Sequence, residues 1–483
     1  MVGPGDKPLL STKLFYGSGS VAYGVKDAGF AYFLLFYYSN VLGLNPQLAG
    51  LAILLALVCD AISDPLVGHF SDQLHSKWGR RHPFMYASIL PIGISFFFIW
   101  NPPAGLDQSG LFLYLFGMAV LVRTCVTFFE VPSTSLVAEL TDDYDQRTSM
   151  LGYRYFFGWW GGLTVAVLAY AILLVPVPEA GIVNGQMNPE GYQRYGLLAA
   201  VIMMVFIFIS ARGTHRHVPN LHKPPPPQPF SLSRTIHELR ETLLHRPFLA
   251  LFFAAIVTAM AQGVITTLNL YFWTYFWFLN TTEIAIITSA WFFAAAFALI
   301  LAPIITRGRN KRNVVIVLSI ISTCYLPLPI ALKTMGLFWP TGHEMVVPTL
   351  VLHAISEGTI IIMISILVSS MVADVVESSE IRTGRRSEGI FFAARSFAGK
   401  VVSGIGVFIG ATIISIVGIP RGAAPETVDP AIMTNFATYY VPTIMFIYFI
   451  SIGILSLYKI TREGHADNLN TVRERRAAAA SRE

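Results

Sequence analysis

Cysteine and charge are both scarce in this sequence. Its three cysteines, Cys59, Cys125 and Cys324, fall within apolar stretches and lie far apart, so they form neither a disulfide framework nor a metal-ligand spacing. Charged residues make up only 13% of the 483 residues, whereas 54% are hydrophobic, which leaves too few charges for an ordinary soluble surface. Most of the chain must therefore face lipid.

A Walker motif is also absent, and a cleavable signal peptide is not expected. Without a Gly-x-x-x-x-Gly-Lys-Ser/Thr segment, coupling to ATP hydrolysis is disfavoured. The first apolar stretch, Leu14 to Leu44, is too long for a signal peptide, so we expect it to remain as a membrane helix. The formal charge of +5 comes from basic residues clustered in loops, which indicates orientation in a lipid bilayer and not binding to nucleic acid.

Apolar stretches long enough to cross a bilayer recur along the whole chain. A helix needs roughly 20 such residues to cross about 30 Å of hydrocarbon. An even number of crossings puts both termini on the same side. Twelve membrane helices are predicted, at about 14–41, 48–70, 83–100, 110–138, 150–175, 193–212, 247–279, 282–306, 312–333, 345–373, 387–418 and 432–459.

Lysine and arginine concentrate in every second loop, and the alternate loops have almost none. Because cytoplasmic loops hold the excess of positive charge, we expect both termini to be cytoplasmic, in a multi-pass protein of the cell (inner) membrane. The basic loops follow predicted helices two, six, eight and ten and contain Lys77, Arg80, Arg81, Arg212, Arg216, Lys223, Arg307, Arg309, Lys311, Arg312, Arg382, Arg385 and Arg386.

A proline-rich stretch separates two groups of six helices. Residues 217–229 include four consecutive prolines and cannot be helical, whereas the apolar residues beyond them repeat at the spacing of an interfacial helix. That helix would present Ile236, Leu239, Leu243 and Leu244. The sequence therefore predicts four parts: a six-helix bundle at 1–212, a cytoplasmic linker at 213–246, a second six-helix bundle at 247–459 and a cytoplasmic tail at 460–483.

The two halves contain a repeated segment. Ser135 to Thr148 resembles Ser370 to Thr383 at a constant offset, since 373 − 138 and 382 − 147 are both 235. Both segments carry acids at matching positions and close on an Arg-Thr pair. Parallel repeats of this kind characterise major facilitator transporters, so the expected fold is an all-α membrane protein of two pseudo-symmetric six-helix bundles.

A series of motifs spanning both halves resembles the glycoside-pentoside-hexuronide:cation symporter family of the major facilitator superfamily, which includes the melibiose permeases. A single match would be weak, but the motifs occur in order along the chain. They are Asp60 to Gly68, Ser71-Asp72, Ser76 to Pro83, Phe129 to Pro132, Tyr153-Arg154 and Arg382 to Gly389, with Lys400 beyond them.

The first helix departs from this family pattern. The melibiose permeases carry a Lys-Asp pair early in the helix, and the corresponding positions here, counted from Tyr16, are Tyr23 and Gly24. A Lys26-Asp27 pair follows three residues later, almost one helical turn, so we expect it to face the same cavity at another depth. Fine substrate specificity is therefore not carried over from the family.

Two carboxylates lie inside the second apolar stretch. Asp60 and Asp64 are four residues apart and project from one face of a helix, where like charges repel and ionised groups are costly. This favours a shared proton or a bound Na⁺, and the alternative is a pair capped by hydroxyls or an arginine. The family resemblance implies that Thr127 and Glu130 complete a cation site and that Glu130 also touches substrate. The alternative for Glu130 is an ion pair with Arg123, two turns away.

Charged and aromatic residues are predicted to line a substrate cavity. Arg154 and Lys400 match basic positions that line the sugar cavity or neutralise its acids in the family. Glu357 with His353 forms a polar i, i+4 pair, although such a histidine more often packs in the interior. Trp159 is placed to stack on a sugar ring, whereas most other aromatic stretches indicate interfacial belts. The predicted substrate-binding residues are Lys26, Asp27, Arg123, Glu130, Arg154, Trp159, Glu357, Arg395 and Lys400.

A further set of residues resembles the facilitator loop motif and predicts a cytoplasmic gate. In that motif a glycine permits close helix approach, and charges pair across the cytoplasmic face. The alternative, ordinary positive loop charge, fits the arginines but not Asp72. With the repeated acidic segments included, the predicted gating residues are Gly68, Asp72, Arg80, Arg81, Glu139, Arg147, Asp374 and Arg382.

The predicted function is symport of a sugar, glycoside or hexuronide with Na⁺ or H⁺ by alternating access, with no other cofactor. A second interpretation, from the same superfamily branch, is cation-coupled transport of a lysophospholipid or another amphiphile. An intramembrane enzyme would need a catalytic dyad or metal set, and no such spacing is found. A receptor would not require three buried acids aligned with a basic set. We expect a monomeric transporter that is not an enzyme.

Overall fold

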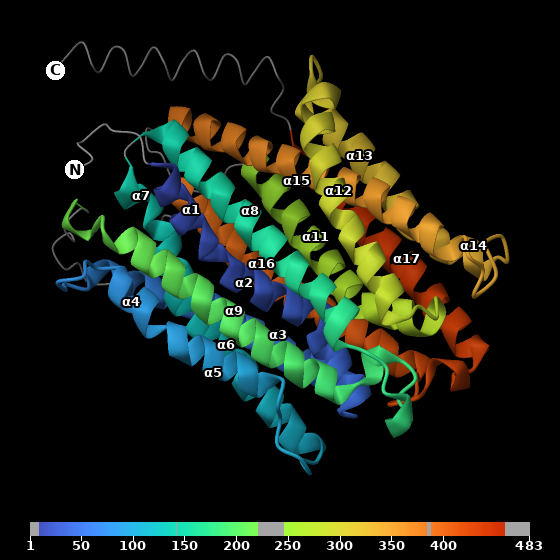
Figure 1. Ribbon diagram of the computed structural model, residues 1–483. Coiled ribbons are helices and arrows are strands. Elements are labelled where there is room, and N and C mark those ends of the chain that lie inside the picture. Colours follow the sequence, from blue (N-terminus) through green and yellow to red (C-terminus); the bar gives the residue numbers. More distant parts are fainter. Residues whose placement is uncertain (1–8, 142, 221–245, 384–387, 459–483) are drawn as a thin grey trace. The chain divides into compact units, whose positions relative to one another are not determined.

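The computed structural model describes residues 9–141, 143–220, 246–383 and 388–458, and helices make up most of that part of the chain (Figure 1). Within these ranges the only pairing of extended residues is an isolated bridge between Val177 and Ile182. The predicted interfacial helix around 236–244 and the predicted tail lie outside the described residues. The helical class expected from the sequence is confirmed.

Six of the predicted membrane helices precede the linker. The first is divided at Gly19 and ends in two π-helical turns, and three others consist of consecutive segments. In chain order the elements are α1 (Leu10–Ser18), α2 (Ser20–Gly29), η1 (Phe30–Leu34), η2 (Tyr37–Val41), α3 (Pro46–Gln73), α4 (His82–Ala87), α5 (Ile89–Ile99), α6 (Gln108–Ser135), α7 (Val137–Leu140), α8 (Tyr144–Leu168), η3 (Ala169–Leu173) and α9 (Pro189–His215), with short 3-10 turns η4 (Pro178–Ala180), η5 (Gly185–Met187) and η6 (Val218–Asn220).

The second half of the chain follows the same plan. Its elements are α11 (Arg246–Tyr271), π-helical η7 (Phe272–Phe276), α12 (Thr281–Thr306), α13 (Lys311–Tyr325), α14 (Leu328–Thr334), α15 (Val346–Thr383), α16 (Glu388–Val417), the 3-10 turn η8 (Pro425–Thr427) and α17 (Pro430–Leu455). Most ends fall within a few residues of the predicted ones. The exception is α15, which continues ten residues past the predicted end at 373 (383 − 373).

Eleven helical spans within the described residues are long and apolar enough to cross a membrane. The remaining predicted span, the first, is interrupted by Gly19 and by its π-helical turns, so no single helix in it reaches that length. The multi-pass architecture expected from the sequence is thus present.

Local capping determines where the principal helices of the first half begin. Asn45, Asp107 and Asn188 accept hydrogen bonds from backbone N–H groups at the starts of α3, α6 and α9. Proline occupies the first helical position of α3, where it costs no hydrogen bond. Because α3 begins at Pro46, Asp60 lies about 21 Å along its axis, in the middle of the helix.

The chain divides into two compact units, which are described separately. Unit 1 comprises residues up to 230 together with 266–289 and 407–432, and unit 2 comprises 231–265, 290–406 and 433 onward. Unit 1 therefore contains the first six spans and one end each of α11, α12, α16 and α17.

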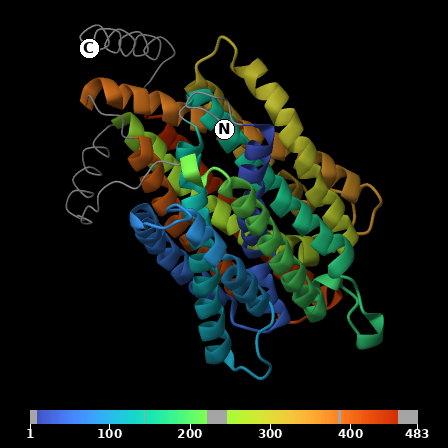
Figure 2. The same ribbon diagram turned by 60° about the vertical axis from the view of Figure 1, so that its left-hand side comes forward.

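In unit 1 the helices pack in pairs that are distant in sequence. α2 packs on α8, α3 on α6 and α5 on α9. The α5 and α9 pair can be followed in both ribbon views, as the blue and green helices (Figures 1 and 2). Unit 2 has its own apolar core, in which Leu251, Val315, Met371 and Tyr458 are buried.

The π-helical turns η2 and η7 occupy equivalent places in the two halves. They begin 235 residues apart (272 − 37), the same offset as the repeated acidic segments. Residues at equivalent positions also touch: Phe36 packs edge-on against Tyr271 at 5.0 Å between ring centroids, and the Asn40 amide donates to the Tyr275 hydroxyl. The internal repeat is therefore visible in backbone geometry as well as in sequence.

Candidate functional site

A cluster of oxygen atoms lies between α3 and α6. The Thr127 hydroxyl on α6 is 3.2 Å from Asp60 Oδ1 and 3.0 Å from Asp64 Oδ1, both on α3. The same hydroxyl is 3.1 Å from the Arg123 carbonyl oxygen in its own helix. Asp60 and Thr127 are buried and Asp64 is half-buried. The spacing of four residues on α3 thus brings both carboxylates to one hydroxyl, as the sequence predicts for that face.

The Thr127 hydroxyl cannot donate a hydrogen bond to both carboxylates at once. A threonine hydroxyl has a single hydrogen, so it donates to only one of its three neighbouring acceptors at a time. The Arg123 guanidinium donates to Asp60 Oδ2 at 3.2 Å and stacks 4.8 Å from the centre of the Phe30 ring. Asp60, Asp64 and Arg123 together carry one net negative formal charge. A monovalent cation or a proton would neutralise it.

The capping alternative for the two carboxylates is therefore partly realised, because a hydroxyl and an arginine both bond to them. Asp60 has the arginine as a direct partner, and Thr127 bridges Asp60 to Asp64. The alternative that pairs Arg123 with Glu130 differs from the ion pair observed, which joins Arg123 to Asp60. Sequence reasoning did not identify that partner, and the assignment of these side chains to a cation site stays a prediction.

Arg154 lies beside the Glu130 turn of α6. Its guanidinium donates to the Ser133 hydroxyl at 2.9 Å and to the Glu130 carbonyl oxygen at 3.4 Å. The guanidinium also lies 5.4 Å from the centre of the Tyr23 ring. Arg154 is buried and Glu130 is half-buried, so this basic group is held within the interior next to the proposed coupling acid.

The departure of the first helix from the family pattern has a packing reason. A Cβ atom at Gly24 would lie 1.9 Å from the Gly158 carbonyl oxygen, and one at Gly162 would lie 2.4 Å from the Gly24 carbonyl oxygen. Small residues spaced by four let helix backbones approach closely in membranes. Position 24 therefore has no room for the acidic side chain of the melibiose permeases, and Tyr23 instead supplies a ring to Arg154. The glycine spacing on α8 was the signal that sequence reasoning missed.

The Lys26-Asp27 pair forms an ion pair near the end of α2. Lys26 Nζ lies 2.6 Å from Asp27 Oδ1, and the lysine side chain is 7% exposed whereas the aspartate side chain is 60% exposed. The aspartate is thus the accessible member of the pair. The role of both residues toward substrate stays a prediction.

Four of the predicted gating residues meet at the end of unit 1 that carries Arg80, Arg81, Arg212 and Arg216, here named the basic end. Arg80 and Arg81 both donate to Glu139 Oε1, at 2.8 and 3.1 Å through their Nε atoms. Arg81 also pairs with Asp72. The loop between α3 and α4 is therefore tied to α7 by a charge network in which Arg81 and Glu139 are buried and Asp72 is exposed.

The other predicted gating residues either make different contacts or have side chains outside the described residues. Arg147 donates to the backbone oxygens of Thr141 and Ala138, so it holds the turn after α7. A Cβ atom at Gly68 would meet only Val131, at an ordinary 3.5 Å, so the close helix approach expected there is not present in this structure. The side chains of Asp374 and Arg382 lie outside the described residues.

In unit 2, Glu357 on α15 is buried and accepts a hydrogen bond from the Ser322 hydroxyl of α13 at 2.6 Å. His353 bonds instead to the Tyr325 carbonyl oxygen at 3.0 Å. The predicted Glu357-His353 pair is thus wrong, because each side chain takes its own partner on α13. Lys400 is half-buried on α16, and the Arg395 side chain lies outside the described residues. In unit 1, Trp159 is 48% exposed on α8.

The end of unit 1 opposite the basic end is closed by neutral contacts. Besides the Asn40-Tyr275 bond, the Ser39 and Tyr271 hydroxyls lie 2.5 Å apart, and the Tyr275 hydroxyl donates to the Ala423 carbonyl oxygen at 3.1 Å. These contacts join segments from both halves of the sequence within unit 1.

Within the described residues no group of three or more His, Cys, Asp and Glu side chains converges as metal ligands do. The carboxylate-hydroxyl cluster is instead the kind of oxygen site that suits a hard monovalent cation or a proton.

Comparisons with known proteins agree with this architecture. A family model described as MFS/sugar transport protein matches residues 15–462. The isoprimeverose transporter of Lactiplantibacillus pentosus is 23% identical, covering 80% of this chain and 76% of its own. A glucuronide carrier protein homologue of Escherichia coli is 24% identical over 83% of each chain. The sodium-dependent lysophosphatidylcholine symporter 1 of Mus musculus is 30% identical over a shorter part, 35% of this chain and 31% of its own.

A solved structure shows the same fold. A bacterial homologue of the human lysosomal transporter Spinster, in an inward-facing and unoccupied conformation, superposes with a TM-score of 0.60, covering 93% of this chain and 95% of the other. At 14% identity the likeness concerns the fold alone.

Proposed function

Since the chain belongs to the MFS/sugar transport protein family, and within it to the glycoside-pentoside-hexuronide:cation symporters, we propose that it carries a sugar, glycoside or hexuronide together with Na⁺ or H⁺ by alternating access. The observation that carries this proposal is the pair of carboxylates around the single Thr127 hydroxyl. The protein would act as a monomeric transporter without an enzymatic step.

The cation would bind at Asp60, Asp64, Thr127 and Glu130. Ionised groups inside a bilayer cost a few kcal/mol and are retained where they serve an ion or substrate path. The Thr127 hydroxyl oxygen already lies within hydrogen-bond distance of one oxygen of each aspartate, and Glu130 follows Thr127 by just under one helical turn. Binding of Na⁺ or a proton would reduce the repulsion between the two carboxylates, which would favour the loaded state.

Substrate would bind next to this cluster. Lys26, Arg123 and Arg154 are buried basic residues in unit 1, and Arg154 contacts the Glu130 backbone directly. With a cation bound, this positive set would tolerate a carboxylated sugar as well as a neutral glycoside. The names of two relatives, an isoprimeverose transporter and a glucuronide carrier homologue, agree with both options.

Alternating access would use the two ends of unit 1. We assign the basic end to the cytoplasm, with both termini there and the protein in the cell membrane, because positive charge marks cytoplasmic loops. The Asp72, Arg80, Arg81 and Glu139 network would then take part in the cytoplasmic gate. The contacts around Tyr275 would close the other side.

Transport of a lysophospholipid is the second candidate function. It is favoured by the partial match to the mouse sodium-dependent lysophosphatidylcholine symporter. Such a substrate would require an apolar path for its acyl chain in addition to the polar site.

A screen of purified protein would test the proposal. Thermal shift would be measured with neutral glycosides, pentosides, hexuronides and a lysophospholipid, each with and without Na⁺ and at two pH values. We expect a carbohydrate to stabilise the protein, and Na⁺ or acid to enlarge that shift. A cation-dependent shift with the lysophospholipid alone would establish the second candidate. A carbohydrate shift that ignores both Na⁺ and pH would contradict symport.

A further inference from the structure

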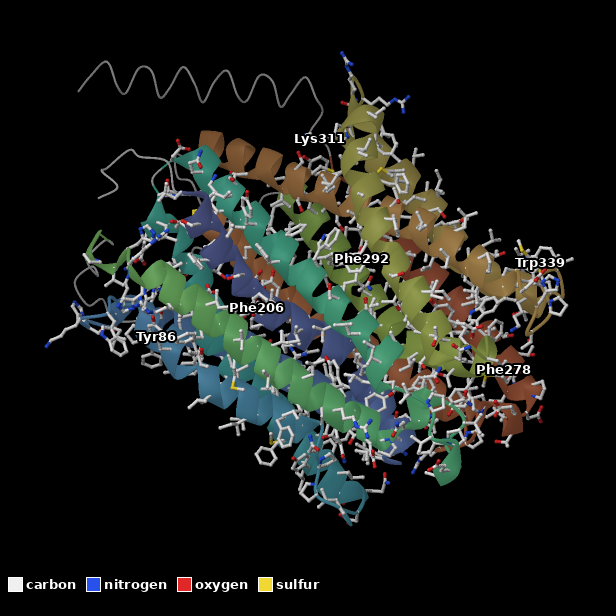
Figure 3. The ribbon with its side chains drawn as sticks, in the orientation of Figure 1. Tyr86, Phe206, Phe278, Phe292, Lys311 and Trp339 are labelled. Atoms are coloured by element: carbon white, nitrogen blue, oxygen red, sulfur yellow. The ribbon has the colours of Figure 1, made fainter. Side chains whose placement is uncertain are left out.

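A cavity of about 470 Å³ opens at the basic end of unit 1, on a part of the surface that the proposed transport site does not use. Its lining consists of Trp78, Tyr86, Arg212 and His215. Trp78 belongs to the loop between α3 and α4, Tyr86 to α4, and the two basic residues to the last turns of α9. Figure 3 labels Tyr86 at this end of the molecule. Cavities of roughly 300–1,000 Å³ are the usual size of small-molecule sites.

The aromatic wall of this cavity is ordered by mutual contacts. The Trp78 and Tyr86 rings meet edge to face at 5.7 Å, and Trp78 meets the His215 ring at 6.1 Å. The Tyr86 hydroxyl is 3.3 Å from His215 Nδ1. Behind them, the buried His82 ring lies 3.0 Å from the Thr214 hydroxyl and packs against His215. The shape of the cavity therefore comes from packed rings and not from a loose loop.

The polar groups that face this cavity keep donor capacity beyond the contact between Tyr86 and His215. The Arg212 guanidinium is exposed and makes no hydrogen bond or ion pair within the described residues, although its charge acts on Tyr86. His215 uses Nδ1 toward Tyr86, and its Nε2 makes no hydrogen bond to a described residue. The described residues of the lining include no carboxylate. A ligand that satisfies this set must be an acceptor, and a negative charge suits it best.

The depth of this cavity identifies the source of such an anion. By length and composition, one candidate membrane span begins at His82 and another ends at His215, so we infer that the cavity lies near the headgroup level. Trp78 is 53% exposed there, and amphipathic rings of this type favour the membrane interface. Basic pockets between membrane helices at that level can bind anionic lipid headgroups.

We propose that Trp78, Tyr86, Arg212 and His215 form a binding site for the phosphate of an anionic phospholipid. Arg212 pairs with the phosphate, His215 donates from Nε2, and the two aromatic rings cover the glycerol next to it. A soluble phosphate compound shares the same recognition chemistry, and the experiment separates the two sources.

Native mass spectrometry tests the proposal directly. Full-length protein is reconstituted in nanodiscs of phosphatidylglycerol or phosphatidylcholine, released into detergent, and its retained lipids are counted. We expect phosphatidylglycerol to be retained, and Arg212→Gln to lower its retention about fivefold, the effect of one basic group near an anionic lipid surface. Arg212→Lys should restore part of the loss, because it keeps the charge.

The matched control is Arg194→Gln, an exposed arginine on the same helix at its opposite end, which should retain phosphatidylglycerol as the wild type does. Equal melting temperatures of the variants would show that folding is intact. Equal retention in Arg212→Gln and wild type would overturn the proposal, and so would equal retention of phosphatidylcholine. Displacement of the lipid by millimolar glycerol phosphate would show that the site is for a soluble phosphate and overturn the lipid assignment.

Discussion

Replacement of Asp64 by asparagine is the most direct test of the cation site. The amide keeps the shape of the side chain and one oxygen but loses the charge. The Asp60, Asp64 and Arg123 set then becomes formally neutral before any cation arrives. Thr127 keeps its hydroxyl and can still donate to Asp60, so the packing of α3 against α6 should persist.

The size of the effect follows from the geometry. A carboxylate about 4 Å from a bound cation contributes about 4 kcal/mol at an effective dielectric constant of about 20, which is an upper estimate. Since 1.4 kcal/mol is a factor of ten, Asp64→Asn should lower Na⁺ affinity by up to about 1,000-fold. Linkage is reciprocal, so the cation enhancement of sugar affinity, typically about 5- to 150-fold, should vanish at ordinary Na⁺ concentrations.

Isothermal titration of the sugar found by the screen, with and without Na⁺ and across pH, measures this effect. Asp64→Asn should retain sugar binding and lose its cation dependence, whereas Glu130→Gln should damage both, because that side chain is proposed to touch both ligands. Glu190→Gln, in an exposed pair with Arg194 on α9, controls for the chemical change. Unchanged cation dependence in Asp64→Asn would refute the site.

Packing and gating give three further tests. Gly24→Ala should destabilise the protein by about 1–3 kcal/mol through overpacking. Gly152→Ala should not, because its Cβ atom meets open space. Equal melting temperatures of the two variants would contradict this prediction. Glu139→Gln should increase opening at the basic end, because two arginines lose a shared acceptor, and unchanged spin-label distances between the bundles would oppose its gating role. Tyr275→Phe should increase opening at the other end by the same measurement, with exposed Tyr439→Phe as control; identical distance distributions would count against that closure.

Much of the fold could be predicted because the bilayer imposes length and composition on each span. The predicted ends of α3, at 48 and 70, differ by only a few residues from Pro46 and Gln73. Hydropathy could not locate the end of α15, because its last ten residues are mostly polar and still helical. It also could not reveal the break at Gly19 or the π-helical turns, since these depend on packing against other helices.

For the candidate site, helical spacing predicted which residues share a helix face but not which partners they bond to. The four-residue interval placed Asp60 and Asp64 on one face, and the structure brings both to Thr127. The choice of partner depends on three-dimensional distance, which explains why Arg123 pairs with Asp60 and why His353 and Glu357 separate. Position 24 likewise has no room for a side chain because α8 packs against it, and the sequence of α2 alone does not show that packing.

The contact between repeat-equivalent residues gives the end of unit 1 opposite the basic end a specific mechanical role. When two equivalent positions touch, they must lie at the axis that relates the repeats. Phe36 with Tyr271, just before η2 and η7, and Asn40 with Tyr275, within them, are two such pairs. Because parallel repeats are related by an axis along the membrane normal, rocking the halves apart at this end must break both pairs together. The loss of one pair should therefore weaken the other. In a double-mutant cycle of Asn40→Ala and Phe36→Ala, the effects of the two substitutions on the closure of this end should not add.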